Sequence, residues 1–104
     1  MSLVRLAGMA DIAPGVPKRV CASGHAICLV RCDDGRFFAV RDACTHEEDA
    51  RLSDGWVSGH QIECSRHNSI FNLQSGEVLS IPAVEPVLTY RTEIEGSDVL
   101  VELP

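Results

Sequence analysis

The apolar residues of this chain come in short runs, and each run ends at a turn-forming residue. β-Branched residues are frequent in these runs, as is typical of strands. No segment keeps up the apolar repeat of a helix over three helical turns. Since an amphipathic helix needs that repeat to bury one face, the sequence predicts an all-β domain.

Turn signals divide the chain into nine predicted strands. They cover residues 3–6, 17–22, 26–31, 36–41, 55–58, 61–63, 70–73, 87–94 and 98–102. Three tight hairpin turns are predicted where residues that tolerate a positive φ separate two such runs. These turns lie at residues 33–35, at Ser58 with Gly59, and at Gly96.

A length of 104 residues predicts a single domain over 1–104, with no second core able to fold alone. Nine basic and 15 acidic residues give a formal net charge of −6. Such a surface repels nucleic acid and anionic lipid and favours a partner with a basic patch. Many solvated proteins without a charged partner are equally acidic, so the charge alone leaves both interpretations open.

The chain is predicted to be cytoplasmic and not to enter a membrane. No stretch approaches the roughly 20 apolar residues of a membrane span, and residues 1–19 lack the apolar core of a signal peptide. The five cysteines are an odd number, so at least one is outside any internal disulfide. A reducing compartment keeps such thiols available as metal ligands.

Two stretches, 42–54 and 64–69, are predicted loops in which polar and sulfur-bearing residues gather. They contain a C-x-H pattern and, after seventeen residues, a C-x-x-H pattern, formed by Cys44, His46, Cys64 and His67. Two thiolates and two imidazoles complete four bonds to metal. Close spacing lets one loop present two ligands, and the long separation lets two loops approach one centre. This donor set suits an iron–sulfur cluster and also tetrahedral zinc.

The pattern resembles the Rieske ferredoxin family, which has a C-x-H followed by a C-x-x-H. The resemblance extends over most of the chain. Residues around the ligands match the family as well: Leu52, Ser53, Gly55, Phe71, Ser75, Gly76, Pro82 and Pro86. The second loop departs from the family pattern, with Ser65 in place of a usual proline and Asn68 in place of a usual glycine. Asn tolerates positive φ, so the turn is still expected to form.

The resemblance implies a Rieske fold: an antiparallel β-sandwich or barrel base and a smaller cluster-binding subdomain of loops and short strands, at about 42–82. It implies one Rieske-type [2Fe–2S] cluster. By resemblance, Cys44 and Cys64 hold the inner iron, and His46 and His67 hold the outer iron near the surface. Neutral imidazoles in place of two thiolates make such a cluster less negative, so it accepts an electron more readily.

The resemblance also bears on the reduction potential. High-potential relatives carry two further cysteines that join the cluster loops, and the corresponding residues here are Asp49 and Arg66. No loop disulfide is therefore expected. Together with the acidic Glu47 and Glu48, this predicts a potential near the lower end of the Rieske range, roughly −150 mV. A hydrogen bond from Ser69 to a bridging sulfide would oppose this trend.

The function implied by the resemblance is that of the ferredoxin component of a bacterial aromatic-ring-hydroxylating dioxygenase system. Such a protein is a soluble, monomeric one-electron carrier in aromatic hydrocarbon catabolism. It takes electrons from an NAD(P)H-dependent flavin reductase and delivers them to a terminal Rieske oxygenase. The sequence has no catalytic triad with motif support and no phosphate, nicotinamide or flavin fingerprint, so no catalysis of its own is predicted.

Two alternatives remain at this stage. One is a zinc-binding structural module, although common two-cysteine, two-histidine fingers pair like with like and place the histidines on a helix. The other is a small Rieske subunit of a larger oxidoreductase, such as a nitrite reductase or an arsenite oxidase. Small subunits of nitrite reductases often lack the ligands, and those of arsenite oxidases are typically exported.

The remaining chemically notable residues are predicted to be structural. Three cysteines in or beside predicted strands are expected to act as small apolar side chains: Cys21, Cys28 and Cys32. His25 and His60, in turns, are predicted to be exposed to solvent. Trp56 and Phe71 flank the loops and are predicted to be core residues.

Overall fold

The computed structural model describes residues 2–66 and 68–104, and these residues form eleven strands in three antiparallel sheets. The strands are β1 (Ser2–Gly8), β2 (Lys18–Ala22), β3 (His25–Arg31), β4 (Phe37–Arg41), β5 (Trp56–Ser58), β6 (Gln61–Glu63), β7 (Ile70–Asn72), β8 (Val78–Ser80), β9 (Thr89–Tyr90), β10 (Thr92–Glu95) and β11 (Asp98–Leu103). Two short 3-10 helices, η1 (Met9–Asp11) and η2 (Leu52–Asp54), are the only helical turns in the described residues. Neither of these two helices is long and apolar enough to cross a membrane.

The base of the molecule consists of two sheets with the orders β1-β11-β10 and β2-β3-β4-β9. Strand β11 alternates strictly: Val99, Val101 and Leu103 are buried, and the residues between them are not. That alternation is expected where one face of a strand packs on a core and the other faces water. The inward residues of both sheets therefore form one apolar layer, the first core, which includes Ile27 and Phe37 of the second sheet.

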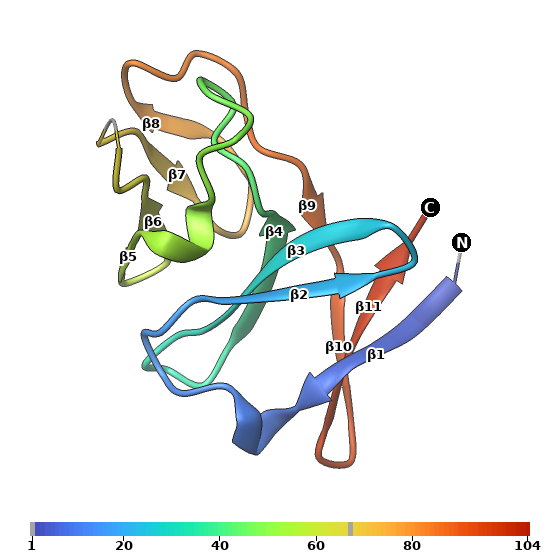
Figure 1. Ribbon diagram of the computed structural model, residues 1–104. Helices are drawn as coiled ribbons and strands as arrows, with labels where there is room; N and C mark the ends of the chain where they lie inside the picture. Colours follow the sequence, from blue (N-terminus) through green and yellow to red (C-terminus); the bar gives the residue numbers. More distant parts are fainter. Residues whose placement is uncertain (1, 67) are drawn as a thin grey trace.

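The third sheet, β5-β6-β7-β8, lies to one side of the base, away from both chain termini (Figure 1). Its Ile62 and Phe71 are fully buried in a second core with Cys28 and Val30 of β3. Alternate residues of β3, such as Ile27, face the first core. Both faces of β3 are therefore covered, which explains its uninterrupted apolar run.

The small sheet is an insertion between two neighbouring strands of the base. The chain leaves the base after β4 and returns through residues 81–88 to β9. Strand β9 then pairs with β4, with Ala39 opposite Tyr90 and Val40 opposite Thr89. The two ends of the insertion are therefore held side by side.

The predicted all-β class is confirmed, and so are the three hairpin turns, at which Gly35, Gly59 and Gly96 have positive φ angles of 88°, 57° and 61°. Two strand predictions were wrong. Strand β8 was missed, and the predicted strand 87–94 is two strands in different sheets, separated at Arg91. A change of sheet depends on distant partners, which the local pattern does not reveal.

The cysteine predictions hold for Cys28 and Cys32, which are buried. Burial raises the pKa of Cys32 to about 11 and also raises that of Cys28, so both stay protonated at neutral pH. The prediction was wrong for Cys21, which is exposed. The residues on either side of Cys21 in β2, Val20 and Ala22, pack against the first core. The alternation of the strand therefore turns Cys21 outward.

Among the aromatic residues and histidines, one prediction is confirmed and three are wrong. Phe71 is a core residue as predicted, but Trp56 is 57% exposed, because its neighbour Val57 packs against the second core and the alternation of β5 turns Trp56 outward. Both histidines are half-buried, not exposed. His25 lies edge-on against the ring of Tyr90, and His60 pairs with Asp34 at 2.8 Å.

Candidate metal centre

The two cysteines of the predicted ligand set come together. Cys44 follows β4 and Cys64 follows β6, and both side chains are fully buried in the second core. The Cys64 thiol is close enough to raise the pKa of the Cys44 thiol. All five cysteines of the chain are free thiols. The structure therefore brings two distant loops to one point through the residues that the motif identified.

The surroundings of Cys44 combine burial with hydrogen-bond donors. Burial is the largest influence and raises the pKa of the Cys44 thiol, and the adjacent Cys64 thiol raises it further. The backbone N–H groups of His46 and Glu47 act in the opposite direction, because they donate to the sulfur and stabilise its thiolate form. Donors aimed at a buried sulfur suit a thiolate that carries a metal.

The histidines of the set differ in what the structure describes. His46 is exposed, two residues beyond Cys44, and has interactions with its surroundings. His67 lies outside the described residues. Its neighbour Asn68 has a positive φ of 60° and its N–H donates to the Cys64 carbonyl at 3.0 Å, so the expected turn forms without glycine.

The first cluster loop, residues 43–51, is anchored by Asp42, whose side chain has no solvent exposure. Its carboxylate accepts hydrogen bonds from the Ser53 N–H at 2.7 Å and from the Ser53 hydroxyl at 2.6 Å. It also accepts one from the Arg19 guanidinium at 2.9 Å. Asp42 therefore joins β2, the end of β4 and η2. Sequence reasoning missed this role, and its one signal was an acid directly after an apolar strand.

The segment 81–88 contacts both cluster loops. The Thr45 hydroxyl donates to the Glu85 carbonyl at 2.7 Å, and the Ala83 N–H donates to the hydroxyl oxygen of the buried Ser69 at 3.0 Å. Pro82 and Pro86, two of the residues that match the family, lie in this segment. Ser69 is thereby fixed in the second loop, residues 64–69.

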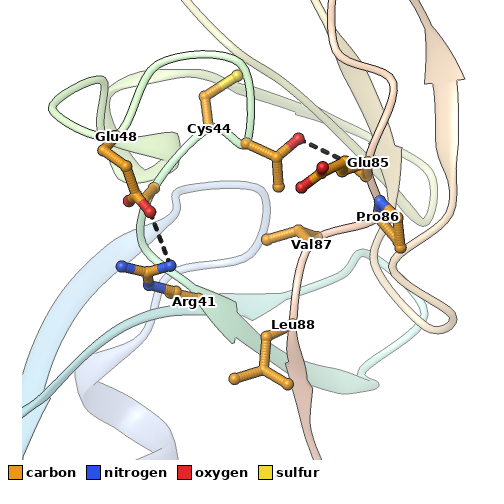
Figure 2. A pocket seen from close by; sticks show the side chains of 9 residues that line it. Arg41, Cys44, Glu48, Glu85, Pro86, Val87 and Leu88 are labelled. Atoms are coloured by element: carbon orange, nitrogen blue, oxygen red, sulfur yellow. Dashed lines mark hydrogen bonds and ion pairs between the residues drawn. The ribbon is translucent and has the colours of Figure 1, made fainter.

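A cavity of about 200 Å³ lies between the first loop and this segment, with Cys44 at one end and Leu88 at the other (Figure 2). Two interactions flank it. One is the Thr45 hydrogen bond, and the other is the ion pair between Arg41 and Glu48, with 3.0 Å between Arg41 Nη1 and Glu48 Oε1. The cavity reaches Cys44, although the Cys44 side chain itself has no solvent exposure.

An ion pair also spans the two loops. Arg66 Nη1 lies 2.8 Å from Glu47 Oε1 and 3.7 Å from Asp49 Oδ1. The sequence had placed Asp49 and Arg66 where high-potential relatives carry cysteines, and the structure shows that these positions do face each other.

The described residues supply the soft half of the predicted ligand set, since Cys44 and Cys64 are buried and backbone N–H groups donate to the Cys44 sulfur. His46 follows two residues after Cys44 and is exposed. Within residues 2–66 and 68–104, no three His, Cys, Asp or Glu side chains are already gathered as a metal site.

Comparison with known proteins places these features in a family. A model of the Rieske [2Fe-2S] domain matches residues 2–91. The ferredoxin component of the p-cumate 2,3-dioxygenase system of Pseudomonas putida is 34% identical over 102 residues, covering 97% of this chain and 86% of the relative.

Two solved structures show the same architecture. The ferredoxin of Sphingomonas yanoikuyae B1 superposes with a TM-score of 0.91 at 31% identity, covering 99% of this chain and 100% of the other. A chain from the complex of reduced oxygenase and oxidized ferredoxin of carbazole 1,9a-dioxygenase gives 0.87 at 32% identity, with 95% and 91% covered. The fold predicted from the sequence is confirmed.

Proposed function

Because this chain belongs to the Rieske [2Fe-2S] domain family, whose members hold one Rieske cluster, we propose that its ligands are Cys44, His46, Cys64 and His67. The burial of Cys44 and Cys64 in one core, with the Cys64 thiol close enough to raise the pKa of Cys44, supports the cysteine half of this set. The C-x-H and C-x-x-H spacing supports the histidine half.

The protein side of this site performs two tasks. The buried Cys44 and Cys64 would hold one iron, and His46 and His67 would hold the other. When bound, the cluster supplies reversible one-electron chemistry. His46 is exposed, so a redox partner can approach this imidazole without any rearrangement of the core.

We further propose that the insertion at about 42–82 is a cluster-binding subdomain within the single domain 1–104. The small sheet β5-β8, the two loops and their shared core support this division. The base then supplies the fixed ends, β4 and β9, on which the loops depend.

The function that this site supports best is that of a soluble, monomeric one-electron carrier in the cytoplasm. It takes electrons from an NAD(P)H-dependent flavin reductase and passes them to a terminal aromatic-ring-hydroxylating oxygenase. The observation that carries this proposal is the full-length similarity to the ferredoxin component of a dioxygenase system. A relative that forms a complex with its oxygenase supports the same direction of transfer.

A spectroelectrochemical titration of the iron-loaded protein tests this function. The expected result is a reversible one-electron step with a midpoint of roughly −150 mV, because no second pair of loop cysteines is present and the first loop is acidic. A midpoint well above zero would contradict the argument from the acidic loop. A loss of the cluster on each cycle of reduction and oxidation would contradict the carrier function itself.

The segment 81–88 offers a docking surface beside the cluster loops. Ile81 and Val84 are 77% and 82% exposed, and the segment is tied to both loops through Glu85 and Ala83. Exposed apolar side chains of this size are common where proteins associate. We assign this surface to the terminal oxygenase.

Val84→Asp is expected to raise the KM of the oxygenase of its own system for this ferredoxin about tenfold, because a charge would have to be desolvated at the contact. The midpoint potential is expected to change little. Val16→Asp is the matched control, since Val16 is 57% exposed but lies before β2, in the base. Equal KM values for the two variants would exclude this surface.

A further inference from the structure

Each of the two cluster loops closes on itself through backbone hydrogen bonds. In the first loop, the Cys44 N–H donates to the Ala50 carbonyl at 2.8 Å, and the Ala50 N–H donates to the Glu47 carbonyl at 3.0 Å. In the second, the Cys64 N–H donates to the Ser69 carbonyl at 2.8 Å. These bonds fix the shape of each loop but not the distance between the loops.

The buried ends of the loops are held together by the core, since Cys44 and Cys64 are both fully buried there. The exposed ends lack that support. At this end, Arg66 of the second loop lies 2.8 Å from Glu47 and 3.7 Å from Asp49 of the first. Among the described residues, both ion pairs that link the two loops are made by this one guanidinium.

Two residues of this ion pair are sequence neighbours of the two histidines. Glu47 directly follows His46, and Arg66 directly precedes His67. A force that draws Arg66 toward Glu47 therefore acts on the peptide next to each histidine of the proposed ligand set.

We propose that Arg66 is a positioning residue, which holds the two histidine-bearing loops at one separation by pairing with Glu47 and Asp49. This inference rests on the proposed ligand set. The loops are thus held at one end by apolar packing and at the other by opposite charge. The Thr45 and Ser69 hydrogen bonds to the segment 81–88 add a support behind each loop.

The strength of this link is limited by its exposure. The side chains of Arg66, Glu47 and Asp49 are 50%, 36% and 80% exposed. Exposed ion pairs contribute little and are screened by salt. The link should therefore affect how long the cluster is retained, not whether the chain folds, and its effect should shrink as ionic strength rises.

Arg66→Gln tests the link in the oxidised, iron-loaded protein, with the rate of iron transfer to a chelator as the readout. At low ionic strength we expect release about three- to fivefold faster than in the unsubstituted protein, as fits the loss of one or two exposed ion pairs. The difference should narrow at about 1 M salt, where charges are screened beyond a few ångströms. The visible circular dichroism of the cluster should change as well, because the histidine loops move apart.

Arg41→Gln is the matched control. Arg41 also pairs with an acid of the first loop, Glu48, at 3.0 Å and with 52% exposure, but from β4 and not from the second loop. The Arg41→Gln substitution removes one positive charge of similar exposure near the same loop, and it leaves the ion pairs between the two loops in place. Its iron release should match that of the unsubstituted protein.

A charge exchange separates positioning from a general effect of charge. Glu47→Arg alone should release iron faster, and the double variant Glu47→Arg/Arg66→Glu should recover toward the unsubstituted rate, because the pair is restored in reverse. The inference is overturned if Arg66→Gln and Arg41→Gln release iron at equal rates. It is also overturned if the double variant releases iron as fast as Glu47→Arg alone. A protein that never takes up two irons would instead refute the ligand set of the proposed function.

Discussion

Cys64→Ala is expected to abolish cluster binding, whereas Cys28→Ala should leave it intact. Both cysteines are fully buried in the same core, so the two substitutions remove the same atoms from equally dry surroundings. They differ in their positions, because Cys64 begins the second loop and acts on the pKa of Cys44, whereas Cys28 lies within β3. Iron and sulfide content after anaerobic reconstitution, together with the visible spectrum, measures the difference.

The comparison between these two cysteines isolates ligation from packing. If loss of the cluster came from a cavity in the core, Cys28→Ala would lose iron as well. Comparable iron content in both variants would remove Cys64 from the ligand set. Cys28 is fixed within β3, outside both cluster loops, so this thiol is not expected to replace the missing ligand.

Asp42→Ala is expected to lower the free energy of unfolding by about 3 kcal/mol, because a buried carboxylate with several donors would be removed. The Ser53 N–H and hydroxyl and the Arg19 guanidinium would lose their acceptor. Urea unfolding of the metal-free protein measures the loss without any contribution from iron. The first cluster loop should then become the least protected part in amide hydrogen exchange.

The control for Asp42 is Asp98→Ala, which also breaks a pairing with an arginine. Asp98 is 44% exposed and pairs with Arg5 at 2.9 Å, so its loss should cost less than about 1 kcal/mol. Similar losses from both variants would mean that the carboxylate of Asp42 does not anchor the loop.

Local pattern predicted most of the strands, and the reason is visible in β3 and β11. In β11 the alternation of buried and exposed residues follows directly from the pleat, and the uninterrupted run in β3 follows from burial on both faces. The glycine turns were found because positive φ is a local requirement, met at Gly35, Gly59 and Gly96.

The errors occur where a partner far along the chain decides the outcome. Trp56 is exposed because Val57, its neighbour in β5, is the residue that packs against the second core, and the sequence of β5 does not show which face is covered. Strand β8 pairs with β7 through an irregular register, which the local pattern of its own residues does not reveal. The break at Arg91 arises because β9 pairs with β4, whereas β10 pairs with β11.

The candidate site shows the same difference between local signals and distant partners. Cys44 and Cys64 were predicted as ligands because metal ligation requires particular residue types at short spacing, and the structure buries both of them in the second core. The anchoring role of Asp42 was not found, since Arg19 lies 23 residues away from it. The pairing of Arg66 with Glu47 depends on the meeting of two loops that no local pattern describes.

Electron paramagnetic resonance of the dithionite-reduced, iron-loaded protein, recorded at low temperature beside an iron and sulfide assay, tests the central claim most directly. Ligation by Cys44, His46, Cys64 and His67 predicts about two irons and two sulfides per chain. It also predicts a rhombic signal with a lower average g value than a four-cysteine cluster gives. A silent spectrum from colourless protein loaded with zinc would contradict the account and identify the four residues as a zinc site.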